Sequence, residues 1–436
     1  MAKSKTGKLA INGGAKTVTL SQERLHDWPL FGGEEDKAVL RVMHAGYGSY
    51  AEMARLEDDF KAYTGAKYAL SVNNGTAALH SAFYAVGVGP GDEVISPSYT
   101  YWATVLTALN LGAAPVFADT LPETLTIDPA DIERKITKRT KAIVVVHLWG
   151  MPCEMDEIMR IARRHKIKVV EDAAQAVGAT YKGKKCGTIG DVGTFSMQAS
   201  KVMPAIEGGM ITTNNKRYLD RCRVLGHYGT LAGTPFVKYN KTGFGFKYRI
   251  HPLAAAIARV QLGKLEEMIS RRNSHVEYFC KKIAGLPGLR QFIIPKNSRR
   301  VYYGFRLQYL PEELGGLNMA SFVAALGAEG VQAARERYSP LHMQPIFTEH
   351  DIFEGEHPWN MGKRWKLPNC YGPGTLPNTE KAFEGVLSLP VFHQASKKLI
   401  DQYASALRKV IENADRVPRT KAKLRQATDG ARAKIR

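Results

Sequence analysis

A lysine and an acid in this chain stand in a pattern that suits covalent chemistry on an aldehyde. Lys201 ends the segment Ser-Met-Gln-Ala-Ser-Lys that begins at Ser196, and Asp172 ends the run Lys-Val-Val-Glu-Asp that begins at Lys168. A lysine amine forms a Schiff base with an aldehyde, and a carboxylate beside a pyridine nitrogen favours its protonated, electron-withdrawing form. Pyridoxal 5′-phosphate needs both. We therefore predict that this cofactor is bound and that Lys201 and Asp172 are catalytic.

Three further positions are candidates for holding the phosphate of that cofactor. Gly75 and Thr76 follow a predicted strand and open a predicted helix, and Ser196 lies near the end of another strand. A helix N-terminus points N–H groups at an anion, glycine permits close approach and a hydroxyl adds a donor. Each residue also has an ordinary explanation, because a capped helix after a strand, or a hydroxyl at a strand end, looks much the same.

Two more side chains complete the predicted site. Tyr101 follows a strand at the carboxyl end, where an open α/β sheet binds its ligand, and it could stack on the pyridine ring, although a Tyr-Trp pair is more often part of a core. Gln175 lies three residues after Asp172, one helical turn away, and could bond the ring oxygen. An acid at position 172 could by itself be only a helix cap. The order of phosphate turn, aromatic, acid and lysine is much more specific than any one member.

The elements that must position these residues alternate between short apolar runs and helical segments. The predicted strands are 68–72, 92–96, 114–118, 142–146, 168–172, 193–196 and 209–212, and helices are predicted at 75–86 and 155–165. Strands separated by helices of this length form right-handed crossovers and a mainly parallel sheet. We therefore expect an α/β fold.

The same pattern divides the chain into four parts. We expect an N-terminal segment at 1–35, a large cofactor-binding domain at 36–285 with its mainly parallel sheet, and a smaller α/β domain at 286–415. A helix at 253–284 would lead out of the large domain, and another at 397–413 would end the small one. Residues 416–436 form a basic tail that we expect to be disordered.

Composition narrows the class of protein. The chain has 436 residues, a formal net charge of +20 and five cysteines. Much of the positive excess lies in the basic tail, so a solvated extension is favoured over a nucleic-acid site. The cysteines form no C-x-x-C pair, which indicates free thiols in a reducing cytoplasm and no metal site. No secretory signal and no apolar stretch long enough to span a bilayer is present, so we expect a cytoplasmic protein without membrane partners.

Together these motifs resemble the DegT-type (DegT/DnrJ/StrS) sugar aminotransferase family, whose members are pyridoxal phosphate enzymes of fold type I with an aspartate-aminotransferase-like fold. The resemblance runs from Leu-Ala-Ile-Asn-Gly-Gly at 9–14 to Leu-Ser-Leu-Pro at 387–390. Its markers include the segments 72–79, 146–150, 171–178, 187–191 and 248–262. The start at 9–14 and the later Trp28-Pro29 also resemble members that act on cyclitol or aminoshikimate-type rings.

The resemblance implies an aminotransferase that moves an amino group from glutamate or glutamine to a ketone of a sugar nucleotide or a cyclitol. It implies a homodimer with shared active sites, and a role in sugar biosynthesis. Lys201 would form the Schiff base and move the proton, while Asp172 would pair with the ring nitrogen and Gln175 with the ring face or hydroxyl. The phosphate would be held by Gly75, Thr76 and Ser196. The ring that stacks on the cofactor would be that of Tyr101.

Two departures from the family pattern bear on this prediction. Lys247 stands where the family has an asparagine that reaches the neighbour's phosphate, and it could reach that phosphate as a point charge or bind a substrate carboxylate. Ile206 replaces a usual glycine, which predicts a different path for the loop after Lys201. The alternatives are a dehydrase or epimerase with the same cofactor, or a non-catalytic cofactor-binding sensor, but a lysine at position 201 favours amino transfer. His147 and His342 are more simply explained as structural than as substrate-binding.

Overall fold

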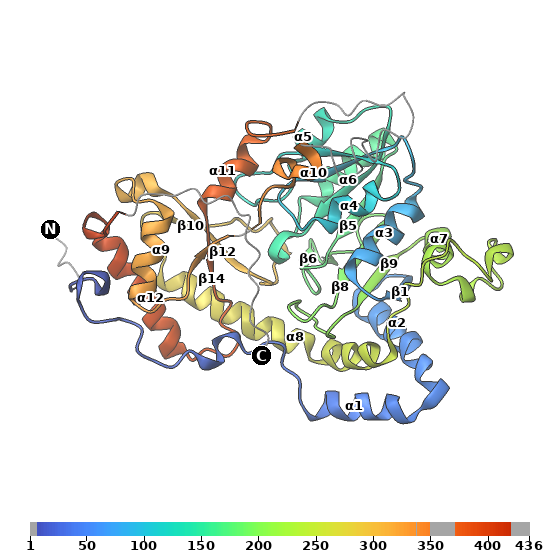
Figure 1. The fold of residues 1–436 in the computed structure, drawn as a ribbon, viewed down its shortest axis with the longest axis horizontal. Helices are drawn as coiled ribbons and strands as arrows, with labels where there is room; N and C mark the ends of the chain where they lie inside the picture. The colour runs from blue at the N-terminus through green and yellow to red at the C-terminus, as the bar shows by residue number, and fades with distance from the viewer. Residues whose placement is uncertain (1–6, 337, 349–370, 420–436) are drawn as a thin grey trace.

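A seven-stranded sheet forms the centre of the molecule in the computed structural model, which describes residues 7–336, 338–348 and 371–419 (Figure 1). Its order is β1-β9-β8-β5-β4-β2-β3. The strands are β1 Tyr68–Val72, β9 Gly209–Thr213, β8 Val192–Ser196, β5 Lys168–Asp172, β4 Thr140–Val146, β2 Glu93–Pro97 and β3 Ala114–Ala118. Within this sheet β9 is antiparallel to β1 and β8, and the remaining neighbours pair parallel. The predicted α/β fold with a mainly parallel sheet is confirmed.

Both faces of this sheet are buried, which explains why β3 and most of β4 read as continuous apolar runs. Successive side chains of a strand point to opposite faces. In β4, Val144 packs into the cluster on the α3 side, whereas Val145 joins the cluster that contains residues of α2, α6 and α8. A strand covered on both sides needs an apolar residue at every position rather than at alternate ones.

Helices cover the two faces and connect the strands. They are α1 Gly33–His44, α2 Ala51–Thr64, α3 Gly75–Val86, α4 Ala103–Leu109, α5 Pro129–Arg134, α6 Met155–His165, α7 Lys216–Gly226, α8 Pro252–Lys282, α9 Met319–Ala328, α10 Pro345–Thr348, α11 Pro377–Gly385 and α12 Lys397–Glu412. The strands and helices predicted from sequence begin and end within two residues of the observed ones. Figure 1 shows α8 running from beneath the large sheet to the small one.

A second sheet of four antiparallel strands lies at the far end of α8. Its order is β10 Leu289–Gln291, β12 Phe305–Tyr309, β14 Val386–Leu389 and β13 Ala334–Arg335. Residues of α8, α9 and α12 complete the apolar core on one face of this sheet. Alternate residues of β12 are buried in that core, so the residues between them belong to the opposite face. A short third sheet joins β11 Ser298–Arg299, β6 Thr180–Tyr181 and β7 Lys184–Lys185.

Most of the segment before α1 packs on the small sheet's domain. Leu9, Val18 and Leu25 belong to the same apolar core as β12 and α12. The carboxylate of Glu329, at the end of α9, accepts the backbone N–H of Ala10 at 2.8 Å. Figure 1 shows this segment crossing beside α9 and α12. The core of the small domain is therefore built from both ends of the described chain.

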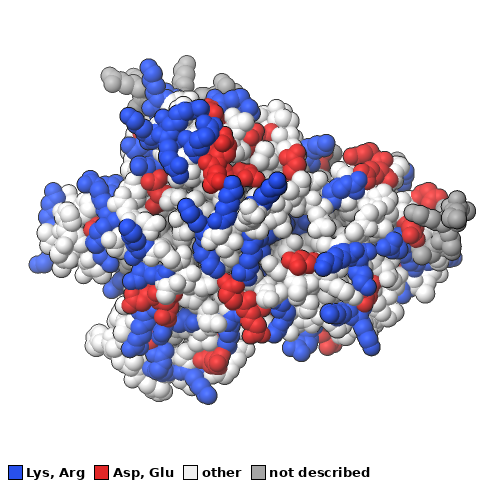
Figure 2. Space-filling model, turned by 180° about the vertical axis from the view of Figure 1, so that it is seen from behind, with Lys and Arg blue, Asp and Glu red and all other residues white. Residues whose placement is uncertain are grey.

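The predicted boundaries near residues 35, 285 and 415 stay predictions. At the start of the predicted basic tail, Val417 is buried in the small-domain core, and Arg419 Nη2 donates to the Gly315 carbonyl at 2.6 Å. The rest of that tail, 420–436, lies outside the described residues. Cys153, Cys186, Cys222 and Cys280 are free and buried. On the face drawn in Figure 2, Lys and Arg side chains are spread over the surface with Asp and Glu side chains between them. Across the described ranges, no helix combines the length and the apolar character needed to cross a membrane.

Candidate active site

The carboxyl ends of three strands meet at one edge of the large sheet. β5 ends at Asp172 and is parallel to β8, which ends at Ser196. Because β9 is antiparallel to both β8 and β1, β1 runs in the same direction as β8. The turn that follows β1 leads directly into Gly75 and Thr76. The predicted acid and phosphate donors therefore share one edge, where an open α/β sheet binds its ligand.

Asp172 is a buried acid held by two hydrogen bonds. Thr104 Oγ1 donates to its Oδ2 at 2.7 Å, and the backbone N–H of Ala174 donates to Oδ1 at 3.1 Å. Burial raises the pKa of Asp172, and the Thr104 hydroxyl, the Ala174 N–H and the charge of Lys201 counteract this rise. The carboxylate is thus placed where a neighbouring cation would stabilise its charged form.

The start of α3 forms a close contact with the end of β8. Asn74 caps the helix by accepting the Ala77 N–H at 2.7 Å. A Cβ added to Gly75 would lie 2.8 Å from the Cβ of Ser196, so only glycine permits this approach. The N–H groups in the first turn of a helix lack intrahelical partners and attract anions. Thr76 lines a cavity of about 300 Å³ beside this turn.

Lys201 lies in the loop between β8 and β9. Its N–H donates to the Gln198 carbonyl at 2.8 Å, and its own carbonyl accepts the indole N–H of Trp28 at 3.0 Å. Its Nζ lies 4.6 Å from the centre of the Tyr303 ring. Its charge also lowers the pKa of Asp172, so the two side chains interact electrostatically. Lys201 thus lies in the loop that starts at the same edge of the sheet where Asp172 ends β5.

The loop after Lys201 contains a backbone conformation that L-residues rarely adopt. Ile206 has a φ of +67° and a side chain that is 52% exposed. Its carbonyl accepts the N–H of Ala199 at 2.9 Å. A β-branched residue in the left-handed region costs about 1–2 kcal/mol. The loop thus takes a turn that glycine would adopt freely, even though isoleucine stands there.

Gln175 is buried beside Asp172, but no helix separates them. Residues 173–178 form turns, with Ala176 N–H bonded to the Ala173 carbonyl at 2.9 Å, so the expected helical turn was wrong. Gln175 Oε1 accepts the backbone N–H of Trp149 at 2.6 Å, and Gln175 Nε2 donates to the Tyr338 hydroxyl at 3.2 Å. These two contacts fix the amide, because its oxygen and nitrogen are not interchangeable as acceptor and donor.

Two of the predicted residues are exposed in the single chain. The Tyr101 side chain is 46% exposed, and its ring centre lies 4.7 Å from that of Trp102. Lys247 is exposed in the segment between α7 and α8. The structure therefore gathers Lys201, Asp172 and the phosphate donors, whereas Tyr101 and Lys247 lie where solvent or another molecule can reach them.

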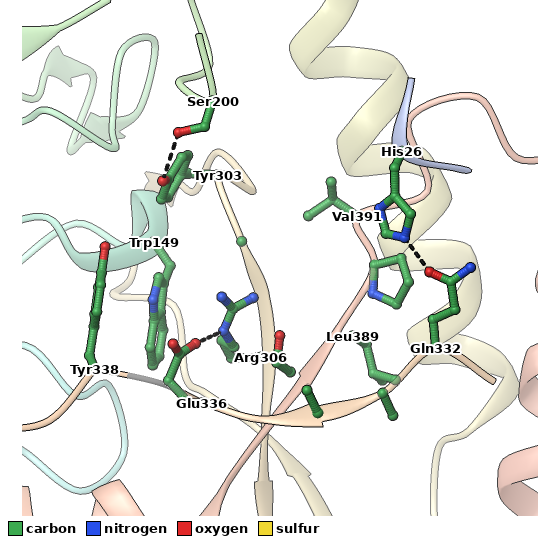
Figure 3. A pocket seen from close by; sticks show the side chains of 15 residues that line it. His26, Trp149, Ser200, Tyr303, Arg306, Gln332, Glu336, Tyr338, Leu389 and Val391 are labelled. Carbon is green, nitrogen blue, oxygen red and sulfur yellow. Dashed lines mark hydrogen bonds and ion pairs between the residues drawn. The ribbon is translucent and has the colours of Figure 1, made fainter. Parts of the chain in front are cut away.

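A cavity of about 570 Å³ opens between the two sheets next to this edge (Figure 3). Trp149 and Tyr338, which hold Gln175, form one wall, and Tyr303, which contacts Lys201, lies above. Arg306 and Glu336 form an ion pair next to Trp149, and His26, Gln332 and Val391 lie on the other side of the space. The size is typical of sites for small molecules.

The sequence analysis assigned no role in the site to several residues of this region. Thr104, Trp28, Tyr303, Arg306 and Glu336 come from four separate segments, since Tyr303 and Arg306 are three residues apart. Thr104 lies in the same short segment as Tyr101, and Trp28 belongs to the Trp28-Pro29 pair of the family resemblance. The others reach the site through tertiary packing alone.

The two candidate histidines are structural in their contacts. His147 is buried; its Nε2 donates to Glu171 at 2.9 Å, and its Nδ1 accepts the Cys153 N–H at 3.1 Å. His342 is buried as well, between Ser98 at 2.7 Å and Glu380 at 3.1 Å. Neither lines the 570 Å³ cavity.

The residues at this edge fit pyridoxal phosphate. A buried acid, an adjacent lysine and a helix start with a glycine that no larger residue could replace match its pyridine nitrogen, aldehyde and phosphate. A metal would need a different donor set. Among the residues that the structure describes, no group of three or more His, Cys, Asp or Glu side chains could hold one.

Comparison with known proteins agrees with this geometry. The profile of the DegT/DnrJ/EryC1/StrS aminotransferase family matches residues 30–408. GDP-perosamine synthase from Caulobacter vibrioides is 39% identical over 323 residues, which cover 73% of this chain and 85% of that protein. Spore coat polysaccharide biosynthesis protein SpsC from Bacillus subtilis is 33% identical over 396 residues, or 89% of this chain and 97% of that protein.

A solved structure extends the likeness to three dimensions. The crystal structure of DesV from S. venezuelae in complex with a ketimine intermediate is 31% identical, covers 88% of this chain and 95% of that one, and has a TM-score of 0.74. The chain therefore belongs to the DegT/DnrJ/EryC1/StrS aminotransferase family and is an aminotransferase of pyridoxal phosphate fold type I.

Proposed function

We propose that this aminotransferase takes an amino group from glutamate or glutamine and places it on a ketone of a sugar nucleotide or a cyclitol. The observation that carries the proposal is that the buried Asp172 and Ser196 end two parallel, neighbouring strands at one edge of the sheet, with Lys201 in the loop that follows Ser196. The similarity to a GDP-perosamine synthase supports a sugar-type acceptor. The cavity beside Lys201 is large enough for such a ring.

Pyridoxal phosphate, when bound, supplies an aldehyde that exchanges amino groups and a ring that withdraws electrons. Lys201 would hold this group through its Nζ and, once released by the donor, move the proton at the reacting carbon. Asp172 would accept the ring N–H, with Thr104 keeping its carboxylate oriented. The Asp172 charge is costly to bury alone, so a protonated ring nitrogen would relieve it.

The other predicted residues would bind and orient the cofactor. The α3 N-terminus with Gly75 and Thr76, together with Ser196, would hold the phosphate. Gln175 would contact the ring, held in place by Trp149 and Tyr338. Tyr101, exposed at the site's rim, would cover the outer face of the ring.

We also propose that the enzyme works as a homodimer with shared active sites. Exposed aromatic residues lie next to each other at the rim of the site. Arg249 lies over the ring of exposed Tyr50, and Trp102 lines one cavity with Tyr248, whose ring stacks on exposed Phe246. Contiguous exposed apolar surface of this kind marks an interaction site. Light scattering of the purified protein should give twice the mass of one chain, and a monomer would refute the proposal.

In such a dimer Lys247 would contribute to the neighbouring site. It is exposed on the segment that carries these aromatic residues. Its ammonium would act on the partner's phosphate as a point charge rather than as the directed donor an asparagine provides. Lys247→Ala should weaken cofactor binding, measured by equilibrium dialysis against pyridoxal phosphate, while the mass of the dimer stays unchanged.

The first test of the function is the absorption spectrum of the purified protein before and after adding glutamate, then glutamine. The band of the lysine-bound cofactor should convert to that of the amino form. Lys201→Ala should abolish the conversion and keep the fold, whereas Lys37→Ala, an exposed lysine on α1, should behave as wild type. A protein that binds the cofactor but ignores both donors would favour a dehydrase, an epimerase or a sensor.

A further inference from the structure

The 570 Å³ cavity, which is lined by Ser200 and Tyr303 next to Lys201, contains one pair of opposite charges among its described Lys, Arg, Asp and Glu residues. Of the residues lining it, Arg306 and Glu336 alone belong to those four types within the described part of the chain. Arg306 Nε bonds Glu336 Oε2, and the two side chains are only 18% and 6% exposed. Among the described residues that line the cavity, Arg306 is the one Lys or Arg, and it is already paired with Glu336 when a phosphate or a carboxylate arrives.

The fold directs Arg306 into this cavity. Its neighbours in β12, Phe305 and Leu307, are buried in the small-domain core, so Arg306 projects from the other face, opposite Ser388 of β14. Its guanidinium carbon lies 5.3 Å from the centre of the Trp149 ring. Figure 3 shows its two terminal nitrogens pointing into the open space below Tyr303.

Glycine at position 304 leaves room for this arrangement. A Cβ there would lie 2.8 Å from Arg306 Nη1. That nitrogen also donates to the Phe305 carbonyl at 3.1 Å. With Glu336, this bond and the Trp149 ring around it, the guanidinium is held in one orientation before any ligand arrives, which lowers the entropic cost of binding.

A buried ion pair is a weak way to stabilise a fold, because desolvation offsets much of the attraction. It does offer strong hydrogen-bonding groups of both kinds at one place. A guanidinium carries five N–H donors, and a carboxylate has about four acceptor positions. Adjacent ring hydroxyls present the complementary set, since each hydroxyl both donates and accepts. An amino-acid carboxylate is a poorer match, because it would lie against Glu336 and be repelled.

We propose that Arg306 and Glu336 recognise two adjacent hydroxyls of the acceptor, so that the acceptor is a ring ketone carrying a vicinal diol. Glu336 accepts a hydrogen bond from one hydroxyl, and Arg306 donates to the oxygen of the next. The inference rests on the proposed function, which it makes more specific. The pair acts on the acceptor and takes no part in the reaction with the amino donor.

The test separates the two half-reactions in single-turnover experiments. Arg306→Lys and Glu336→Gln are loaded with pyridoxal phosphate, and spectral change is followed with glutamate. Their amino forms are then mixed with 2-keto-myo-inositol, with a GDP-linked 4-keto-6-deoxymannose and with cyclohexanone. We expect both variants to react with glutamate as wild type does, and to lose about 10- to 100-fold in kcat/KM for the hydroxylated ketone, as hydrogen bonds to charged groups predict.

Matched controls come from a second ion pair in the same domain. Arg290 Nη2 and Glu313 Oε1 lie 2.6 Å apart, and neither residue lines this cavity. Arg290→Lys and Glu313→Gln should therefore leave both half-reactions unchanged. Gly304→Ala displaces the guanidinium without changing any charge, and should reproduce the acceptor defect. Gly304→Ala therefore tests the same inference if Glu336→Gln fails to fold.

Each outcome decides the inference. Whichever hydroxylated ketone is aminated identifies a cyclitol or a sugar nucleotide as the source of the diol. Equal kcat/KM for cyclohexanone, amination of neither hydroxylated ketone, an unchanged acceptor reaction in the variants, or a defect in the glutamate reaction would overturn it. If the wild-type enzyme reacts with neither glutamate nor glutamine, the proposed function fails. If the wild-type enzyme reacts with a donor but one of the outcomes just named is observed, the inference about Arg306 and Glu336 alone fails.

Discussion

Replacing Thr104 by valine tests the electrostatics at Asp172 most directly. The substitution keeps the volume of the side chain but removes the hydroxyl that donates to Asp172 Oδ2 at 2.7 Å. Hydrogen bonds to charged groups contribute about 1.5–3 kcal/mol, and those between neutral groups about 0.5–1.5 kcal/mol. The variant should therefore lose more stability when Asp172 is ionised than when it is protonated.

The pH dependence follows from the raised pKa of Asp172. Because burial raises this pKa, the unfolded chain ionises first as pH rises, and the folded state loses stability until its own carboxyl ionises. Without the Thr104 hydroxyl the folded pKa rises further, so this loss continues to higher pH. The gap between wild type and Thr104→Val should widen by about 1 kcal/mol from acid to neutral pH.

Urea unfolding of the cofactor-free protein at fixed protein concentration, repeated across that pH range, measures this gap. Thr107→Val is the matched control, since the Thr107 hydroxyl on the same helix donates to the neutral Ala103 carbonyl at 2.8 Å. Its loss should cost about 0.5–1.5 kcal/mol at every pH. Thr104→Ser should restore the wild-type profile. A Thr104→Val gap that is independent of pH would refute the assignment of Thr104 to the charged form of Asp172.

Three further substitutions test separate features of the site. Gly75→Ala should weaken cofactor affinity in equilibrium dialysis, because its Cβ would lie 2.8 Å from the Cβ of Ser196; unchanged affinity would count against the phosphate site at the start of α3. Ile206→Gly should raise the free energy of unfolding by about 1 kcal/mol by relieving the left-handed backbone, and a loss of stability would show that its exposed side chain is packed in the assembled protein. Trp28→Phe should lower the free energy of unfolding by about 0.5–1.5 kcal/mol, because the hydrogen bond to the Lys201 carbonyl is lost, and should also slow the donor half-reaction. A change in stability alone would mean that this bond does not position the lysine.

The large domain was predictable because its strands are buried on both faces. Runs such as 114–118 and 142–146 are apolar at every position, and the helices between the strands have clear starts, so element type and order follow from local pattern. The antiparallel direction of β9 has no such signal, because it depends on which strand lies next to it.

Some residues of the site could be predicted from their sequence neighbours, and others could not. Lys201, Asp172 and Gly75 lie in motifs whose chemistry can be predicted from a few neighbouring residues. Arg306 and Glu336 become a pair only when β12 and the segment after β13 meet across β14. The helical turn expected before Gln175 was wrong for a related reason: its amide is held by Trp149 and Tyr338, contacts from elsewhere in the chain that no local spacing can reveal.

The packing of the N-terminal segment on the small domain has a consequence for how the chain folds. Ala10 bonds Glu329, 319 residues later, and Thr19 bonds Gln402, 383 residues later. During synthesis the N-terminal segment therefore cannot form these contacts until most of the chain has been made. Contacts of such sequence separation slow folding and leave apolar side chains such as Leu25 exposed meanwhile. Because Trp28 belongs to the same segment, the contact on the Lys201 carbonyl forms late, and the active site is among the last parts of a newly made chain to be completed.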